Sequence, residues 1–376
     1  MGGQSGHVVK YIHCEKLMLQ NWLKPLPPSV VDAAEQCAEG CIGQQAVLFQ
    51  KDFPDLKKVK IALVGLDDTS ADAVRKVLYG FSASFAKGAI ADLGNIRKAD
   101  TTQIVSVVYE LITGKVLPIL IGHHHDWAKA QFLAYQEAKA VVNWTVIDEL
   151  FRSGSTGAPL LDAGHPMLFH YALIGAQAHL LPEKVQKMMD KNHFELFRLG
   201  RTRTALEEAE PILRDADLLS FHLNALKNCE APGVQTPSVS GFFLEEACQL
   251  TRYAGMSDKL TSFGVYGLET GNDPGGITAQ ATAQLVWYFL DGFFNRKGDY
   301  PASVKGLTEY VVDLPEFNHQ LTFWKSTLSG RWWLQVPVDI KRKHQRHRLI
   351  PCSFQDYQLA CRQELPDRFF RAFKRF

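Results

Sequence analysis

The feature that most constrains the fold is a regular alternation of short, almost continuous apolar runs with longer segments of helical periodicity. Seven runs have the length and the β-branched and aromatic content of buried strands: 58–66, 116–122, 141–148, 170–176, 193–200, 217–226 and 260–269. Segments with apolar residues at helical spacing lie between or after them: 30–41, 71–80, 101–115, 126–140, 183–192, 205–216, 242–255 and 277–294. Strands that are apolar on both faces and separated by helices are typical of a parallel sheet covered on both sides.

This alternation predicts a three-layer α/β/α domain whose mostly parallel, doubly wound sheet has about eight strands. We expect that domain to span residues 56–298, after an N-terminal helical lead-in over residues 1–55. The pattern changes in residues 299–376, where HQLTFWKSTLSGRWWLQVPV is typical of a β-hairpin and a basic amphipathic helix ends the chain. We interpret this last part as an appendage to the α/β domain.

The composition argues against several classes of protein. No stretch approaches the roughly 20 apolar residues of a membrane-spanning helix, and the first residues lack the pattern of a secretion signal. The seven cysteines, an odd number, fit buried thiols in a reducing compartment better than a disulfide framework. We therefore predict a cytoplasmic protein without a transmembrane segment.

Charge is unevenly distributed along the chain. Residues 341–376 contain ten Lys and Arg against three Asp and Glu, although the whole chain has a net charge of only +1. The basic stretch KRKHQRHR lacks the interleaved aromatic residues of single-strand binders, so we predict no nucleic-acid partner. A tail of this kind indicates a protein partner or a homo-oligomer. We expect its phenylalanines to pack on the domain, with peripheral membrane contact through residues 368–376 as the open alternative.

Polar groups follow four of the apolar runs, in IGHHHD, NWTVIDE, SFHLNAL and GLETGND. In an open parallel sheet, ligands bind beyond the carboxyl ends of the strands. The order and spacing of these segments resemble the arginase, agmatinase and formimidoylglutamase family, the ureohydrolases, over roughly residues 58–297. Further segments that carry the resemblance are IADLGNIR, EEACQLTRYAGMSDK and TAQATAQLVWYFLDGF.

The resemblance implies an arginase-like fold and two manganese ions bound by three motifs. These motifs are Gly-Gly-x-His at one strand end, Asp-x-His-x-Asp on the next strand and Asp-x-Asp on a later one. Ligands two residues apart on a strand point to the same face, and carboxylates with imidazole suit Mn²⁺. The metal pair would supply the hydroxide that attacks a guanidinium or formimino carbon.

The first two motifs are only partly present in this chain. His125 stands at the histidine of the first motif. Aligning NWTVIDE with the second motif places Thr145, Ile147 and Glu149 at its three ligand positions. We exclude Asp148, because a shift of one residue turns a side chain to the other face of the strand.

The third motif has lost its carboxylates. His222 and Asn224 stand where two aspartates are expected, and Glu269 corresponds to a later glutamate that helps to hold the substrate. Glu149 is therefore the only anion among the expected ligands, and it does not offset the repulsion between two divalent cations. We identify the chain as a divergent member of the family with degenerate metal-ligand motifs.

The predicted function is that of a pseudoenzyme. It would be a non-catalytic scaffold or interaction protein with no cofactor, whose former active-site cleft is available to a small-molecule ligand. The alternative is an active C–N hydrolase of linear amidines that resembles formimidoylglutamase. It would use a single Zn²⁺ or Mn²⁺ ion held by His125, Glu149 and His222, since two histidines and a glutamate form a known catalytic ligand set.

One other polar cluster was considered as a catalytic set. Asp162, His165 and His170 lie close together in LLDAGHPMLFH. No activated serine or cysteine motif accompanies them, so we interpret them as polar residues of a loop.

Overall fold

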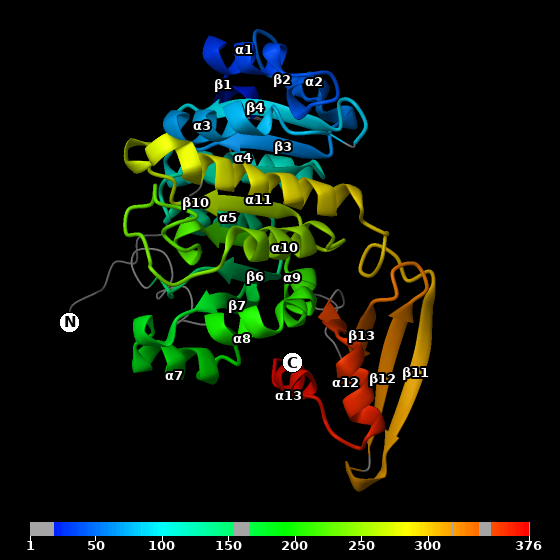
Figure 1. Cartoon of the computed structure of the whole chain (residues 1–376). Helices are drawn as coiled ribbons and strands as arrows, with labels where there is room; N and C mark the ends of the chain where they lie inside the picture. The colour runs from blue at the N-terminus through cyan, green and yellow to red at the C-terminus, as the bar shows by residue number, and fades with distance from the viewer. Residues whose placement is uncertain (1–18, 84, 153–164, 318, 338–346, 376) are drawn as a thin grey trace, which may run out of the picture.

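The chain folds into a large α/β unit and a smaller C-terminal unit that lies beside its lower end (Figure 1). The structure is a computed structural model that describes residues 19–83, 85–152, 165–317, 319–337 and 347–375. A mostly parallel sheet with helices on both faces forms the large unit, and a separate antiparallel sheet forms the small one. The predicted three-layer architecture with a C-terminal appendage is confirmed.

The central sheet has the strand order β1-β4-β3-β5-β10-β9-β6-β7-β8, with β2 also paired to β4. Its strands are β1 (Leu23–Lys24), β2 (Val47–Leu48), β3 (Ile61–Gly65), β4 (Ile90–Ile96), β5 (Leu117–Gly122), β6 (Val142–Ile147), β7 (Leu168–Ala176), β8 (Glu195–Arg198), β9 (Leu218–His222) and β10 (Ser262–Tyr266). The described pairings are parallel except for that of β1 with β4. The eight longer strands match the predicted number. The two short ones come from the segment that we predicted to be a helical lead-in.

Two helical layers cover this sheet. One face packs against α1 (Pro28–Gln36), α3 (Asp68–Leu78), α9 (Glu210–Asp215), α10 (Leu244–Gly255) and α11 (Ile277–Phe294). The other face packs against α4 (Thr101–Thr113), α5 (Trp127–Glu137) and α7 (Glu183–Lys191). The short helices are α2 (Ile42–Gln45) and α8 (Leu199–Thr204). Helix α11 contacts both α3 and α10, which explains why Asp291 is its single charged residue.

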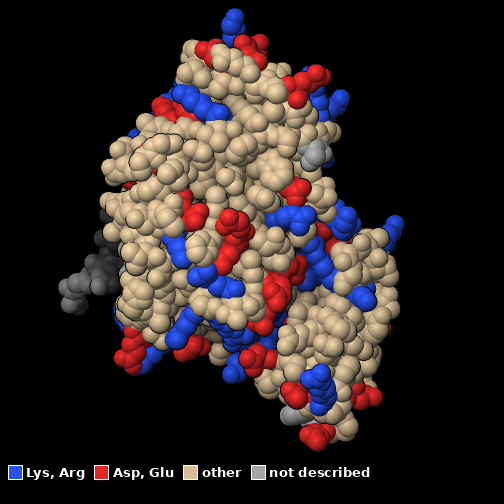
Figure 2. Space-filling model, in the orientation of Figure 1, with Lys and Arg blue, Asp and Glu red and all other residues tan. Residues whose placement is uncertain are grey.

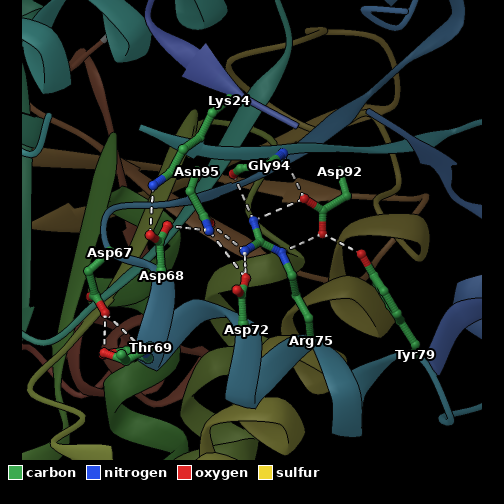
Figure 3. Close-up of polar contacts among 11 residues, drawn as sticks. Lys24, Asp67, Asp68, Thr69, Asp72, Arg75, Tyr79, Asp92, Gly94 and Asn95 are labelled. Carbon is green, nitrogen blue, oxygen red and sulfur yellow. Dashed lines mark hydrogen bonds and ion pairs between the residues drawn. The ribbon is translucent and has the colours of Figure 1, made fainter. Parts of the chain in front are cut away.

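Strand β4 was not among the predicted strands, because Asp92 and Asn95 interrupt its apolar pattern. Both are buried in the structure against Arg75 of α3, which is itself fully buried (Figure 3). Arg75 donates from Nε and Nη2 to the two carboxylate oxygens of Asp92 at 2.8 and 3.0 Å, and from Nη1 to Asp72 at 2.9 Å. The Tyr79 hydroxyl donates to Asp92 at 2.7 Å. This satisfied network joins α3 to β4.

The C-terminal unit is an antiparallel sheet in the order β11-β12-β13-β14, packed against two helices. Its elements are β11 (Leu307–Leu314), β12 (His319–Ser326), β13 (Trp332–Gln335), β14 (Leu349–Cys352), α12 (Phe354–Cys361) and α13 (Asp367–Phe373). The predicted hairpin is β12–β13, with Gly330 at φ +74° in its turn. The appendage contains more elements than predicted, since β11, β14 and α12 were not anticipated.

A buried arginine attaches this unit to the α/β unit. Arg214 of α9 donates to the carbonyl oxygens of Trp332 and Cys352, each at 3.1 Å, and its guanidinium lies 4.4 Å from the ring centre of Trp333. The terminal phenylalanines behave differently from the prediction. Phe369 is buried, but Phe370 and Phe373 are exposed, and Phe376 lies outside the described residues.

None of the described helices combines the length and the apolar character that are required to cross a bilayer.

Replacing Arg75 with methionine is expected to lower the free energy of unfolding by about 3–5 kcal/mol, because Asp92 would remain buried without its counter-ion. The matched control is Lys24→Met, which removes a solvent-exposed ion pair with Asp68 and is expected to cost less than about 1 kcal/mol. Urea unfolding of both variants measures the difference. Losses of equal size would contradict the role assigned to Arg75.

Candidate functional site

Three polar side chains meet at the carboxyl edge of the central sheet. His125 follows β5, Asp148 follows β6, and His222 is the last residue of β9. These strands lie within the stretch β5-β10-β9-β6 of the sheet. The carboxyl ends of neighbouring parallel strands share one edge, so segments that are distant in sequence come together there.

The two histidines are in direct contact. Nδ1 of His125 and Nδ1 of His222 are 2.8 Å apart, so one ring donates a hydrogen bond and the other accepts it. Gly267, at the end of β10, makes room for the His125 ring. A Cβ atom at this position would lie 2.6 Å from Cε1 of His125, and the φ of +107° also favours glycine. Strands β5, β9 and β10 therefore fix the histidine pair.

The first turn of α3 holds the two loops that flank this pair. The Asp67 carboxylate caps α3 by accepting from the backbone of Ser70, and it also accepts from the backbone N–H of His123 at 3.0 Å. Nδ1 of His123 lies 3.1 Å from the same carboxylate. The Ser70 hydroxyl donates to the carbonyl oxygen of Leu268, next to Gly267. His123 thus binds α3 rather than the His125 pair.

A small cavity of about 30 Å³ lies beside the histidine pair, with room for about one water molecule. Asp148 is fully buried at this cavity and accepts from Arg152 Nε at 2.6 Å. A second, longer bond of 3.3 Å joins Arg152 Nη2 to the other carboxylate oxygen. The residues that line the cavity are His125, Ala128, Trp144, Val146, Asp148, Leu150, Phe151, Arg152, Tyr171 and His222.

Burial dominates the protonation of this site. It lowers the pKa of His125 to about 3 and that of His222 well below its ordinary value, and the nearby Arg152 guanidinium lowers both further. Burial raises the pKa of Asp148 to about 6, although the ion pair with Arg152 opposes this shift. At neutral pH the site therefore holds two neutral imidazoles and one arginine–carboxylate ion pair.

The structure corrects the exclusion of Asp148. Residues Trp144, Val146 and Asp148 face the cavity, whereas Ile147 packs in the core on the other face of the sheet. Glu149 does not line the cavity, and its nearest side-chain partner is Gln177, with Nε2 3.5 Å from Oε2. Because β6 is buried on both faces, its sequence pattern does not show which set of alternate residues faces the site.

The remaining predicted residues lie around this centre without joining it. Thr145 is buried within β6 and does not line the cavity. Asn224 is buried just beyond His222, and its amide donates to the carbonyl oxygen of Thr236 at 2.7 Å. Glu269 is half-buried at the start of a short turn.

The cluster in the loop before β7 does not line the cavity either. His170 lies within β7, and His165 packs edge-on against Phe132 at 5.2 Å between ring centres. Asp162 lies outside the described residues. Sequence reasoning missed Arg152, whose position four residues after Asp148 was the available signal.

These residues do not fit a binuclear manganese centre. The cavity offers one carboxylate, that of Asp148, and Arg152 already neutralises it. Two nitrogen ligands of one tetrahedral zinc ion lie about 3.3 Å apart. The Nδ1 atoms of His125 and His222 are 2.8 Å apart, so an ion between them would have to push the two rings apart.

The predicted ligand set is not assembled. In the part of the chain that the structure describes, no three His, Cys, Asp or Glu side chains are grouped so as to hold a metal ion. Glu149 lies with Gln177 rather than with the two histidines. Metal binding by His125, Glu149 and His222 stays a prediction.

The chain is similar to known proteins over most of its α/β unit. The family model described as the arginase family matches residues 68–291. A formimidoylglutamase of Staphylococcus haemolyticus is 26% identical in an alignment of 188 positions that covers 46% of this chain and 60% of that enzyme. The match thus spans less than two thirds of that relative. A formimidoylglutamase of Staphylococcus aureus is 22% identical in an alignment of 241 positions that covers 58% of this chain and 77% of that enzyme.

Solved structures share the fold at lower identity. The Trypanosoma cruzi formiminoglutamase crystallised with Mn²⁺ superimposes with a TM-score of 0.57 at 17% identity, covering 65% of this chain and 97% of that one. The formimidoylglutamase of Bacillus subtilis gives a TM-score of 0.57 at 16% identity, covering 65% and 91%. Both matches leave about a third of this chain outside the shared fold.

The buried histidines are expected to make the protein less stable in acid. Each histidine is neutral in the folded protein and titrates near pH 6.5 in the unfolded chain. Its contribution to the free energy of unfolding is therefore complete above pH 6.5 and is lost as the pH falls below that value. His222→Asn keeps an amide that can bond to His125 but removes this titration. Between pH 6.5 and 4.5, the free energy of unfolding of the unmodified protein is expected to fall by about 2 kcal/mol more than that of the variant.

Urea unfolding at several pH values measures this difference. The raised pKa of Asp148 acts in the opposite sense, but it is present in both proteins. The control is His179→Asn at an exposed histidine, which should leave the pH dependence unchanged. Parallel pH profiles for the unmodified protein and His222→Asn would show that the pair is not buried in the neutral form.

Proposed function

This chain belongs to the arginase family, and we propose that it is a non-catalytic member of that family. In this proposal it serves as a scaffold or interaction protein. Membership rests on the family model, which matches more than half of the chain. The observation that carries the proposal is the ion pair between Asp148 and Arg152 beside the His125–His222 pair.

Charge is the first argument for lost manganese catalysis. Asp148, Leu150 and Arg152 line the cavity at the two-residue spacing of the Asp-x-His-x-Asp motif, and we take them as its counterparts. A leucine then replaces the histidine, and an arginine replaces the second aspartate. A guanidinium within about 4 Å of a divalent cation would repel it by several kcal/mol. The cavity thus contains a cation of its own.

The third motif supports the same conclusion. His222 is neutral and is engaged with His125, and Asn224 is neutral and donates to the backbone of Thr236. Neither residue supplies the negative charge that two manganese ions require. Among the residues that the structure describes, Asp148 is the only anionic side chain that lines the cavity.

The C-terminal unit supports a role in interaction. Large apolar side chains on this unit are exposed, namely those of Val311, Leu328, Phe354, Phe370 and Phe373. In this proposal, these side chains supply contacts to the partner. The partner in this proposal is a protein, either a different one or a second copy of this chain. A small ligand at the old site would require Arg152 to move, because the cavity accommodates only about one water molecule.

The second candidate is a single-metal amidine hydrolase, and the histidine pair favours it. Two neutral imidazoles lie in contact at the strand ends, and the neutral form is the one that binds a metal. The relatives named formimidoylglutamase make linear amidines the substrates to test.

The proposal predicts that the full-length, tag-free protein contains no stoichiometric metal and does not hydrolyse amidines. Metal content is measured by mass spectrometry after incubation with Mn²⁺ or Zn²⁺ and gel filtration. Release of formamide or ammonia from N-formimidoylglutamate and of urea from agmatine and arginine is measured in parallel.

The control is the double variant His125→Ala, His222→Ala. The unmodified protein and this variant should retain the same background amount of metal. Near-stoichiometric metal that the double variant loses, together with turnover, would establish the hydrolase instead.

A further inference from the structure

Charged groups rather than apolar packing attach the C-terminal helix α13 to the α/β unit. Its buried residues, Phe369 and Ala372, pack against the C-terminal unit itself. A groove of about 360 Å³ runs between α12 and α13 on one side and β8 and α8 on the other. Figure 2 shows Lys, Arg, Asp and Glu side chains gathered along the junction of the two units.

Arg375, which follows α13, enters an acidic slot of the α/β unit. Its Nη2 contacts Oε1 of Glu195 on β8, and its Nη1 lies 3.9 Å from the Asp215 carboxylate at the end of α9. All three side chains are less than 10% exposed. A buried carboxylate is strongly destabilised without its counter-ion, so this contact holds α13 in place.

His170 of β7 lies against the same carboxylate oxygen of Glu195. Its Nε2 is 3.6 Å from Oε1, its side chain is 5% exposed, and neither ring nitrogen has a hydrogen-bond partner among the described residues. A neutral imidazole competes weakly with Arg375 for Glu195. A protonated one would pair with Glu195 and repel Arg375.

A second histidine links the C-terminal segment to this slot. Nδ1 of His347 is 3.1 Å from Nζ of Lys259, which precedes β10, and its ring stacks on Phe169 at 4.4 Å between ring centres. An ammonium group only donates, so Nδ1 of His347 accepts and carries no proton. Lys259 is fixed by Asp215 at 2.7 Å and lies 3.9 Å from Asp217. Protonation of His347 would place two cations in contact.

We propose that α13 is a pH-operated strap that Arg375 holds on the α/β unit at neutral pH and that protonation of His170 and His347 releases in acid. The charged groups that face these histidines from the neighbouring elements are Glu195, Asp215, Asp217, Lys259, Arg368, Arg371 and Arg375.

The direction of the effect follows from linkage. Burial lowers the pKa of His170, and the cations Arg375, Lys259, Arg371 and Arg368 lower it further. Release of α13 moves Arg368, Arg371 and Arg375 away from His170 and exposes its ring to water. His170 therefore binds a proton more tightly in the open form, in which α13 is released, than in the closed form. Falling pH therefore favours the open form.

Hydrogen exchange of the full-length protein at pH 7.5 and 5.5, corrected for intrinsic exchange rates, tests this proposal. Protection of residues 367–375 is expected to fall about tenfold in acid, while α11 stays protected and reports on global folding. In the double variant His170→Asn, His347→Asn, the protection of residues 367–375 should fall by less than about threefold between the two pH values. The control His179→Asn, at an exposed histidine, should behave like the unmodified protein.

Equal protection of residues 367–375 at both pH values in the unmodified protein would overturn the proposal. A full pH response that persists in the double histidine variant would do the same. If that variant loses the protection of α11, Arg375→Met provides the second test. Its residues 367–374 should exchange rapidly at both pH values, and protection equal to that of the unmodified protein would refute the role of Arg375.

Discussion

The buried ion pair between Arg75 and Asp92 fixes the helix on which the candidate site depends. It ties α3 to β4 in the interior of the α/β unit, so the start of α3 has one position relative to the strand ends. From that start, Asp67 holds the loop that carries His125, and Ser70 holds the loop after β10. The positions of these loops are therefore set by contacts with the core.

Hydrophobic periodicity was sufficient to predict the fold class and seven of the eight longer strands, because buried parallel strands have a simple apolar signature. Strand β4 escaped detection since the side-chain partners of Asp92 and Asn95, among them Arg75 and Tyr79, lie on a different element, and no local pattern reveals them. The C-terminal sheet was underestimated for a related reason. Strand β11 exposes Glu309 and Asp313 to solvent, so it lacks the apolar run of a buried strand.

The site was predictable only in part. Strand ends of a parallel sheet share an edge, so the meeting of His125 with His222 could be anticipated. The choice between Asp148 and Glu149 could not be predicted, because β6 is buried on both faces. The residue at which β6 ends decides which of the two side chains enters the cavity. Arg152 lies beyond the strand, and its pairing with Asp148 became visible only once the fold placed both at the cavity.

In the proposed non-catalytic protein, the Arg152 guanidinium takes the place of a metal cation beside Asp148. The most direct test is diffraction from crystals grown with excess Mn²⁺ or Zn²⁺, with data recorded at the absorption edge of each metal. This proposal predicts that the Arg152 guanidinium lies on Asp148, that the two Nδ1 atoms are in contact and that the cavity shows no anomalous peak. An anomalous peak bonded to His125 and His222, with Arg152 displaced from Asp148, would contradict it.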